Sequence, residues 1–117
     1  GNVVIGGSLV VTGALSAPVP TEVASANGTL AITNGSVPIT KASAIALTIP
    51  APTRNGLVLY IFATTAHAHV VTVTGGYNGT ANTIGTFGGA IGDGVVLMSY
   101  NSNWYIVPGT NLNVSLS

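Results

Sequence analysis

The stretch GVVLMSYNSNWYIVP, residues 94–108, decides the fold that the sequence predicts. Val95 to Tyr100 is a run of β-branched, aliphatic and aromatic residues, Asn101 to Asn103 has turn chemistry, and Trp104 to Val107 is a second run that stops at Pro108. This pattern predicts a β-hairpin. The hairpin holds the only Trp and the only Met of the chain and no charged side chain, so we interpret it as a packing nucleus.

Similar runs occur on both sides of this hairpin, and Gly- or Asn-rich turns separate them at intervals of roughly 8 to 12 residues. The runs are TLAIT (29–33), SVPIT (36–40), SAIALTI (43–49), LVLYIFATT (57–65), HVVTVT (69–74), NTIGTF (82–87) and a last short one at 112–116. No stretch shows the 3.6-residue periodicity of an amphipathic helix. The sequence therefore predicts an all-β body over residues 21–117, as an antiparallel β-sandwich or jelly roll.

Charged residues make up 3% of the 117 residues, against about 25% in an ordinary soluble protein. They are Glu22, Lys41, Arg54 and Asp93, and the net charge is zero. Such a chain cannot steer a charged partner over distance, so we expect no nucleic-acid binding. Neutral surfaces tend to associate, and the composition favours a subunit whose surface is buried in an assembly.

The run LVLYIF, residues 57–62, supports the same interpretation. It is apolar at both odd and even positions, whereas HVVTVT alternates between apolar and polar residues. A strand that is apolar on both sides needs cover on both sides. In so small a sandwich a neighbouring subunit is the economical candidate for the second cover.

Residues 1–20 are predicted to form a separate N-terminal β arm and linker. Two short Val-rich runs, punctuated by glycine, supply the expected attachment residues Val3, Val4, Ile5, Val10 and Val11. The runs predict a pair of short strands that dock on a body or on neighbouring chains, and an ordinary edge hairpin of the main domain is the alternative. The segment APVP that follows favours an extended linker.

Other classes of protein find little support in the sequence. The longest apolar run, Leu57 to Ala63, is far short of the roughly 20 residues that a spanning helix needs, so we expect no membrane partner. The absence of cysteine excludes disulfides and thiolate chemistry. Gly1 at the start is compatible with either removal of the initiator Met or a fragment.

The segment HAHVVTVTGGYNGTANTIGTFGGAIGDGVVLMSYNSNWYIV, residues 67–107, resembles a recurrent C-terminal domain of structural proteins in tailed bacteriophages. The shared order is a Thr-rich strand with His, a Gly-Gly-x-Asn-Gly turn, the segment FGGAIGDG, and an aliphatic strand that leads into a Tyr-Asn-x-x-Trp-Tyr hairpin. The opening NVVIGGSLVVTGALS is similar to the Gly-punctuated strands that lead into phage fibre domains.

This resemblance implies a non-enzymatic, homotrimeric β-sandwich on the virion exterior. The expected role is capsid decoration or a head-fibre protein, with the major capsid protein or other virion proteins as partners. The first alternative is a tail-fibre or receptor-binding domain that recognises a host glycan. A bacterial surface or adhesive module without a virus is a second.

His67 and His69 form the sharpest candidate site in the sequence. On a strand, residues two apart share a face, so both imidazoles could bind a metal ion on the axis of a trimer. The alternative, which we favour, is a pair of ordinary histidines at the start of a strand, because no third ligand type accompanies them. No cofactor is expected.

Catalysis finds no motif in the chain. No G-x-S-x-G elbow supports a Ser-His-Asp triad, although Asp93, His67 and serines are present. A glycosidase pair would have to use Glu22 and Asp93, the only two acids. We therefore expect that the protein is not an enzyme.

Aromatic residues offer the last candidate site. Tyr77, Tyr100, Trp104 and Tyr105 could stack on a sugar, which is a common way for a β-sandwich to bind a glycan. We favour the alternative that Trp104 fills the core or a subunit interface.

Overall fold

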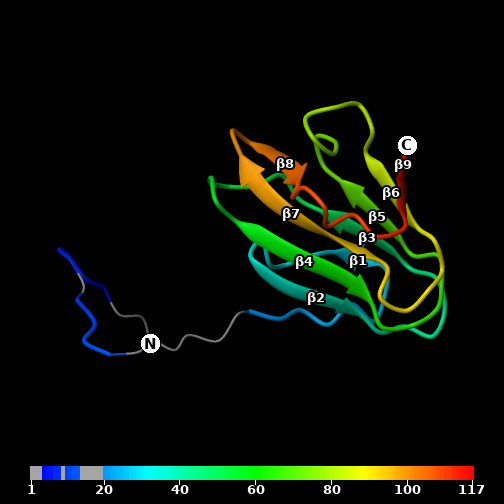
Figure 1. The fold of residues 1–117 in the computed structure, drawn as a ribbon, viewed down its shortest axis with the longest axis horizontal. Helices are drawn as coiled ribbons and strands as arrows, with labels where there is room; N and C mark the ends of the chain where they lie inside the picture. Colours follow the sequence, from blue (N-terminus) through cyan, green and yellow to red (C-terminus); the bar gives the residue numbers. More distant parts are fainter. Residues whose placement is uncertain (1–3, 9, 14–19) are drawn as a thin grey trace.

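The computed structural model describes residues 4–8, 10–13 and 20–117, and within these ranges the protein contains β-strands and no helix (Figure 1). The strands are β1 (Gly28–Thr29), β2 (Gly35–Ile39), β3 (Ala46–Ile49), β4 (Val58–Ala63), β5 (Val70–Val73), β6 (Ile84–Phe87), β7 (Gly94–Tyr100), β8 (Asn103–Ile106) and β9 (Val114–Leu116). Each strand coincides or overlaps with one of the runs that were predicted to be β-strands. The all-β prediction is therefore confirmed.

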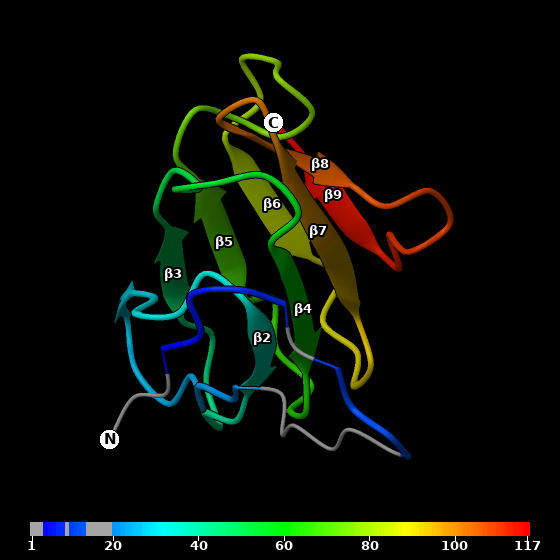
Figure 2. The same cartoon turned by 90° about the vertical axis from the view of Figure 1, so that its left-hand side faces the viewer.

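The strands form two sheets that pack face to face as a β-sandwich (Figure 2). One sheet has the order β1-β3-β5-β6-β9 and the other the order β2-β4-β7-β8. One core cluster fills the space between them, with side chains such as Leu59 and Leu97 from the four-stranded sheet and Ile49, Val71 and Phe87 from the five-stranded sheet.

The two sheets are mixed, so the prediction of an antiparallel sandwich or jelly roll is wrong in this respect. The pairs β1/β3, β2/β4 and β3/β5 are parallel, and the other four pairs are antiparallel. The reason is that the chain changes sheet after each of β1, β2, β3 and β4. The chain reverses direction at each of these turns and also crosses to the other sheet. After two such turns it is back in the same sheet and runs in the same direction, so strands two apart in the chain become parallel neighbours.

The hairpin of residues 94–108 is present as predicted. Strands β7 and β8 pair in an antiparallel register that sets Tyr100 against Asn103. The two residues between them, Asn101 and Ser102, have φ values of 50° and 65°. Two consecutive positive φ angles are the mark of a type I′ turn, whose twist matches that of the strands it joins.

Other segments cover the sheet edges. Residues 20–24 run along the outer edge of β2, with Glu22 N donating to Ser36 O. At β8, Asn78 N donates to Trp104 O and Asn78 Oδ1 accepts from Ile106 N. Beside β9, the side-chain amide of Asn111 bonds both the N–H and the C=O of Val114. These contacts limit edge-to-edge pairing between chains at β2, β8 and β9.

Residues 4–8 and 10–13 lie apart from the sandwich (Figure 1). Val4, Ile5, Val10 and Val11 are all exposed. The described residues of this segment, 4–8 and 10–13, belong to no strand in the single chain, and the β arm expected to dock on a body or on neighbouring chains stays a prediction. Val3 lies outside the described residues.

Candidate functional site

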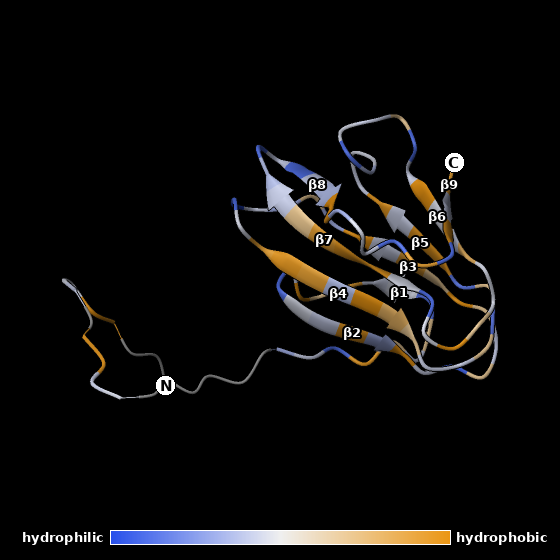
Figure 3. Cartoon of the chain, in the orientation of Figure 1, coloured by the Kyte–Doolittle hydropathy of each residue, from blue (hydrophilic) through white to orange (hydrophobic). Residues whose placement is uncertain are grey.

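The outward side of the four-stranded sheet carries a continuous set of large uncharged side chains, which we call the apolar face. Its members are Tyr60, Phe62, Val96, Met98, Tyr100 and Tyr105. They stand outward because side chains alternate along a strand and the intervening residues, such as Leu59 and Leu97, fill the core. Figure 3 shows β4 coloured as hydrophobic over most of its length.

The strand register brings these side chains together. Tyr60 on β4 stands opposite Val96 on β7, and Met98 stands opposite Tyr105 on β8. Directly opposed residues on neighbouring strands have Cβ atoms about 5 Å apart, so the side chains touch across the sheet. None of the four charged residues of the chain belongs to one of the described strands. The face is therefore both large and without charge.

A groove of about 470 Å³ opens at one end of the apolar face. Gly94 lies opposite Phe62 and leaves its floor without a side chain, while Tyr60, Phe62 and Leu112 form its walls. A Cβ atom at Gly94 would come within van der Waals overlap of the Ile61 carbonyl oxygen, so only glycine fits there. The close approach of β4 and β7 at Gly94 therefore keeps a side chain out of this part of the groove.

Polar groups at the groove are already engaged. The Thr110 hydroxyl donates to Val107 O at 2.7 Å and accepts from Val96 N at 3.2 Å. Among the described residues, no buried side-chain nitrogen or oxygen lacks a hydrogen-bond partner. The groove therefore offers shape and apolar contact to a ligand or partner, rather than an unpaired polar anchor.

The outward side of the five-stranded sheet has a different character. Thr29, Thr48 and Thr72 form one row across β1, β3 and β5, and Thr86 and Ser115 are paired on β6 and β9. Hydroxyl groups suit contact with water, although Ile84 is also exposed on this side. The sandwich is thus two-sided, with hydroxyl groups on one surface and aromatic and aliphatic groups on the other.

Two of the four aromatic residues predicted as a glycan or interface site lie in the core. Trp104 and Tyr77 are fully buried. The Trp104 indole N–H donates to Pro50 O at 2.9 Å, and the Tyr77 hydroxyl donates to Val71 O at 2.8 Å. Burial also raises the pKa of Tyr77 far above its ordinary value. Neither ring can stack on a sugar at the surface, whereas Tyr100 and Tyr105 are exposed on the apolar face.

Sequence reasoning did not select Tyr60 and Phe62 as site residues, although it noted that residues 57–62 are apolar at both odd and even positions. That double apolar character was the signal that could have found them. The structure divides the run into inward Leu59 and Ile61 and outward Tyr60 and Phe62. The cover predicted for the outward half stays a prediction, since the single chain leaves it exposed.

His67 and His69 do not share the face of a strand, because both precede β5. His69 is fully buried, and its Nδ1 accepts from Ile45 N at 3.3 Å while its Nε2 lies 3.1 Å from Thr65 Oγ1. The Thr65 hydroxyl donates to Lys41 O, so Nε2 must carry the proton that it shares with Thr65. Both ring nitrogens are occupied, and burial lowers the pKa of His69 below its ordinary 6.5.

This arrangement makes His69 a structural residue that ties the β4–β5 loop to the β2–β3 loop. Its nitrogen lone pair is committed to a backbone N–H, so it is not free to bind a metal. The rings of His67 and His69 stand edge to face with centroids 6.0 Å apart. Within residues 4–8, 10–13 and 20–117 no group of three potential ligand side chains could complete a metal site.

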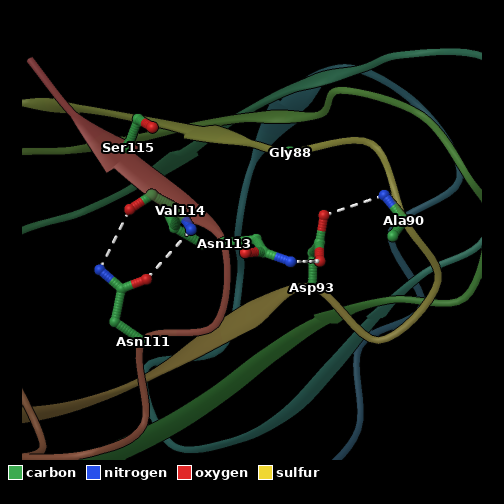
Figure 4. Close-up of a pocket in the computed structure, with 7 residues that line it drawn as sticks. All are labelled: Gly88, Ala90, Asp93, Asn111, Asn113, Val114 and Ser115. Atoms are coloured by element: carbon green, nitrogen blue, oxygen red, sulfur yellow. Dashed lines mark hydrogen bonds between the residues drawn. The ribbon is translucent and has the colours of Figure 1, made fainter.

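Asp93 lies at a shallow depression near the end of β6 (Figure 4). Its Oδ2 accepts from Ala90 N at 2.9 Å and its Oδ1 accepts from the Asn113 side-chain amide at 3.0 Å. The Ala90 N–H holds the pKa of this carboxyl below its ordinary value, although burial opposes the shift. Asp93 thus fixes the loop before β7 against residue 113, in the turn role expected of an Asp between glycines.

The hydrogen bonds also separate the groups that catalysis would require. Glu22 Oε1 accepts from Ala31 N, whereas Asp93 is bonded within its own loop and to Asn113. His69 bonds Thr65 and Ile45 rather than a serine or an acid. In the part of the chain that the structure describes, these contacts give no Ser-His-Asp chain.

Comparison of the chain with models of protein families, with curated proteins and with solved structures gave no match. The fold and the candidate face therefore stand on the strand topology and side-chain positions alone. Across the described residues, no helix has the length and apolar character needed to cross a membrane.

Proposed function

We propose that this chain is a non-enzymatic structural protein of a bacteriophage virion, a homotrimer that decorates the exterior of the head. The observation that carries the proposal is the apolar face, an uncharged sheet surface with Tyr100 63% exposed in the single chain. Exposed apolar area of this kind marks a surface that a partner covers. The resemblance of residues 67–107 to phage structural domains supplies the virion setting.

The mechanism is mechanical. Each Å² of apolar surface removed from water contributes about 25 cal/mol, so many small contacts between subunits and with the capsid add up without any charge pair. The hydroxyl-lined surface of the other sheet then faces solvent. Low charge suits such an assembly because no ion pair has to be desolvated in the interface.

Light scattering on the full chain tests the assembly. We expect a particle about three times the 11.5 kDa chain mass at micromolar concentration. Phe62→Ser should dissociate it, whereas the matched change Ile84→Ser, at a residue equally exposed on the other sheet, should not. A stable wild-type monomer would refute the proposal. Mass spectrometry of purified virions tests the location, and absence of the chain from the particles would remove the decoration role.

The alternative function, recognition of a host glycan by a tail-fibre domain, finds support in Tyr60, Tyr100 and Tyr105. Their rings are exposed together on an uncharged face, where a sugar can stack and bond a phenol hydroxyl. A glycan array separates the two functions. Binding that Tyr100→Ala or Tyr105→Ala abolishes, on a chain that stays folded, would favour the glycan domain over decoration.

A further inference from the structure

The N-terminal segment and the apolar face have matching chemistry. Val4 is 91% exposed and Val10 is 84% exposed, and Ile5 and Val11 are exposed beside them. Figure 3 shows orange, hydrophobic stretches in this segment and places it away from the sandwich. Removal of apolar side chains from water lowers the free energy of the system, and this holds for the segment and for the apolar face alike.

The segment leaves the body beside the sheet that carries this face. Pro20 O accepts from Ser36 N at 2.8 Å, which fixes the exit point at the Gly35 end of β2. A Cβ at Gly35 would overlap the Pro20 carbonyl, so the close approach requires glycine. From Pro20 to Ile5 an extended chain reaches at most about 50 Å. That length is enough to cross onto an adjacent molecule.

The size of the apolar face argues for an additional element in the interface. The three strands that carry the face, β4, β7 and β8, lie about 4.8 Å apart, and six residues of about 3.3 Å along them give a flat area of about 290 Å². A stable interface of standard size covers about 800 Å² on each partner. The accessible surface of the face exceeds its flat area because side chains protrude, and an apolar segment laid on the face adds further buried surface.

We infer that the N-terminal segment of one copy lies across the apolar face of the next copy, with its Val and Ile side chains in the groove between Phe62 and Leu112. This inference rests on the proposed assembly and names the segment that completes its interface. Association by the face is consistent with the capped edges of β2, β8 and β9, which leave little backbone for strand addition.

Such a contact is heterologous, because the segment of one copy meets a different surface, the groove, of the next. Heterologous contacts close into rings when the rotation between subunits allows it. Three copies that each give one segment and receive one would satisfy every groove and every segment. The trimer would then be interlocked by exchange rather than held by flat faces alone.

Cross-linking tests the inference cleanly because the chain has no cysteine. Two single variants, Ile5→Cys and Leu112→Cys with different tags, are mixed in urea, refolded together and treated with a short bismaleimide. A docked segment has an effective concentration of about millimolar against the micromolar of free chains, so we expect the mixed dimer to form about 1000-fold faster than by collision. The matched control pairs Ile5→Cys with Ile84→Cys, whose side chain is exposed on the other sheet.

Each outcome has a distinct meaning when light scattering accompanies the cross-linking. Fast cross-linking of residue 5 to residue 112 but not to residue 84, in a wild-type-like oligomer, supports the inference. Equal rates for the two pairs overturn the segment exchange while a persistent oligomer leaves the proposed assembly standing. Cross-links that form only within one chain, in a diluted Ile5→Cys/Leu112→Cys double variant, also overturn it. A monomer throughout overturns the proposed assembly itself.

Discussion

Gly85 is the position where one methyl group should do the most damage. An Ala Cβ there would lie 2.6 Å from Tyr77 Oη and 3.0 Å from Val114 Cγ1. To restore an ordinary contact of 3.4 Å, the hydroxyl must move by about 0.8 Å. The hydroxyl is now 2.8 Å from Val71 O, and a shift of this size directed away from that oxygen breaks the hydrogen bond.

The expected cost of Gly85→Ala combines two effects. Overpacking costs about 1–3 kcal/mol, and a buried hydroxyl that loses its partner costs about 1–3 kcal/mol. Because relaxation that relieves one effect also relieves part of the other, we expect a loss of about 2–4 kcal/mol in the free energy of unfolding. Urea denaturation followed by the fluorescence of Trp104 measures it.

A double-mutant cycle identifies the cause. Tyr77→Phe removes the hydroxyl that collides with the new methyl group, so Gly85→Ala should cost at least about 1 kcal/mol less in the Tyr77→Phe background. Tyr77→Phe alone measures the loss of the Tyr77 hydroxyl and is the control of the cycle. A loss below about 0.5 kcal/mol for Gly85→Ala, or additive effects in the cycle, would refute the reasoning.

Four further predictions concern single residues. Stability should fall as pH drops below about 6.5, because the unfolded state protonates the imidazole of His69 more readily than the folded state does, and His69→Gln should flatten this slope in pH-dependent melts. Asp93 has a pKa below its ordinary value of 3.8, so its contribution to folding stability should be fully present above pH 3.8 and disappear as the pH falls through the pKa of the folded state. An Asp93→Asn variant whose melting temperature depends on acid as the wild type's does would contradict this. Ser102→Gly should raise the free energy of unfolding by about 0.5 kcal/mol, since glycine adopts a positive φ without strain, and an unchanged urea midpoint would argue against a strained turn. Trp104→Phe should cost about 1–3 kcal/mol by leaving Pro50 O without its donor, and a native emission maximum typical of exposed tryptophan would contradict the burial of Trp104.

The strands could be predicted because their determinants are local. Runs of β-branched residues between Gly and Asn turns placed all nine strands to within a few residues. The pairing of the strands could not be predicted. A turn such as Asn55-Gly56 is compatible with a return to the same sheet and with a crossing to the other sheet. The parallel pair β2/β4 results from such crossings, and nothing in the turns themselves records them.

The candidate face was only partly predictable for a related reason. Successive side chains on a strand point to opposite faces, so Trp104 and Tyr105 must lie on different sides, as must Leu59 and Tyr60. When the residues of both sides are apolar, the pattern does not determine which side faces the core. The sequence therefore grouped buried Trp104 with exposed Tyr105 as one site. The environment of His69 was equally hard to predict, since its ring accepts a hydrogen bond from Ile45 N, which lies 24 residues earlier in another loop, and donates one to Thr65.

The weaving of β2 to β5 between the sheets also has a consequence for how the chain folds during synthesis. Strand β4 lies between β2 and β7, so its second partner leaves the ribosome more than thirty residues later. Loop-closure entropy must be overcome before such distant pairings form, which predicts slow folding on the millisecond-to-second scale. The hairpin β7/β8 and the pair β5/β6 join neighbours in sequence and can form first. Strands β1 to β4 can pair as β1/β3 and β2/β4, but β3 and β4 each keep one unpaired edge until β5 and β7 are synthesised, and in that interval the nascent chain most needs protection from aggregation.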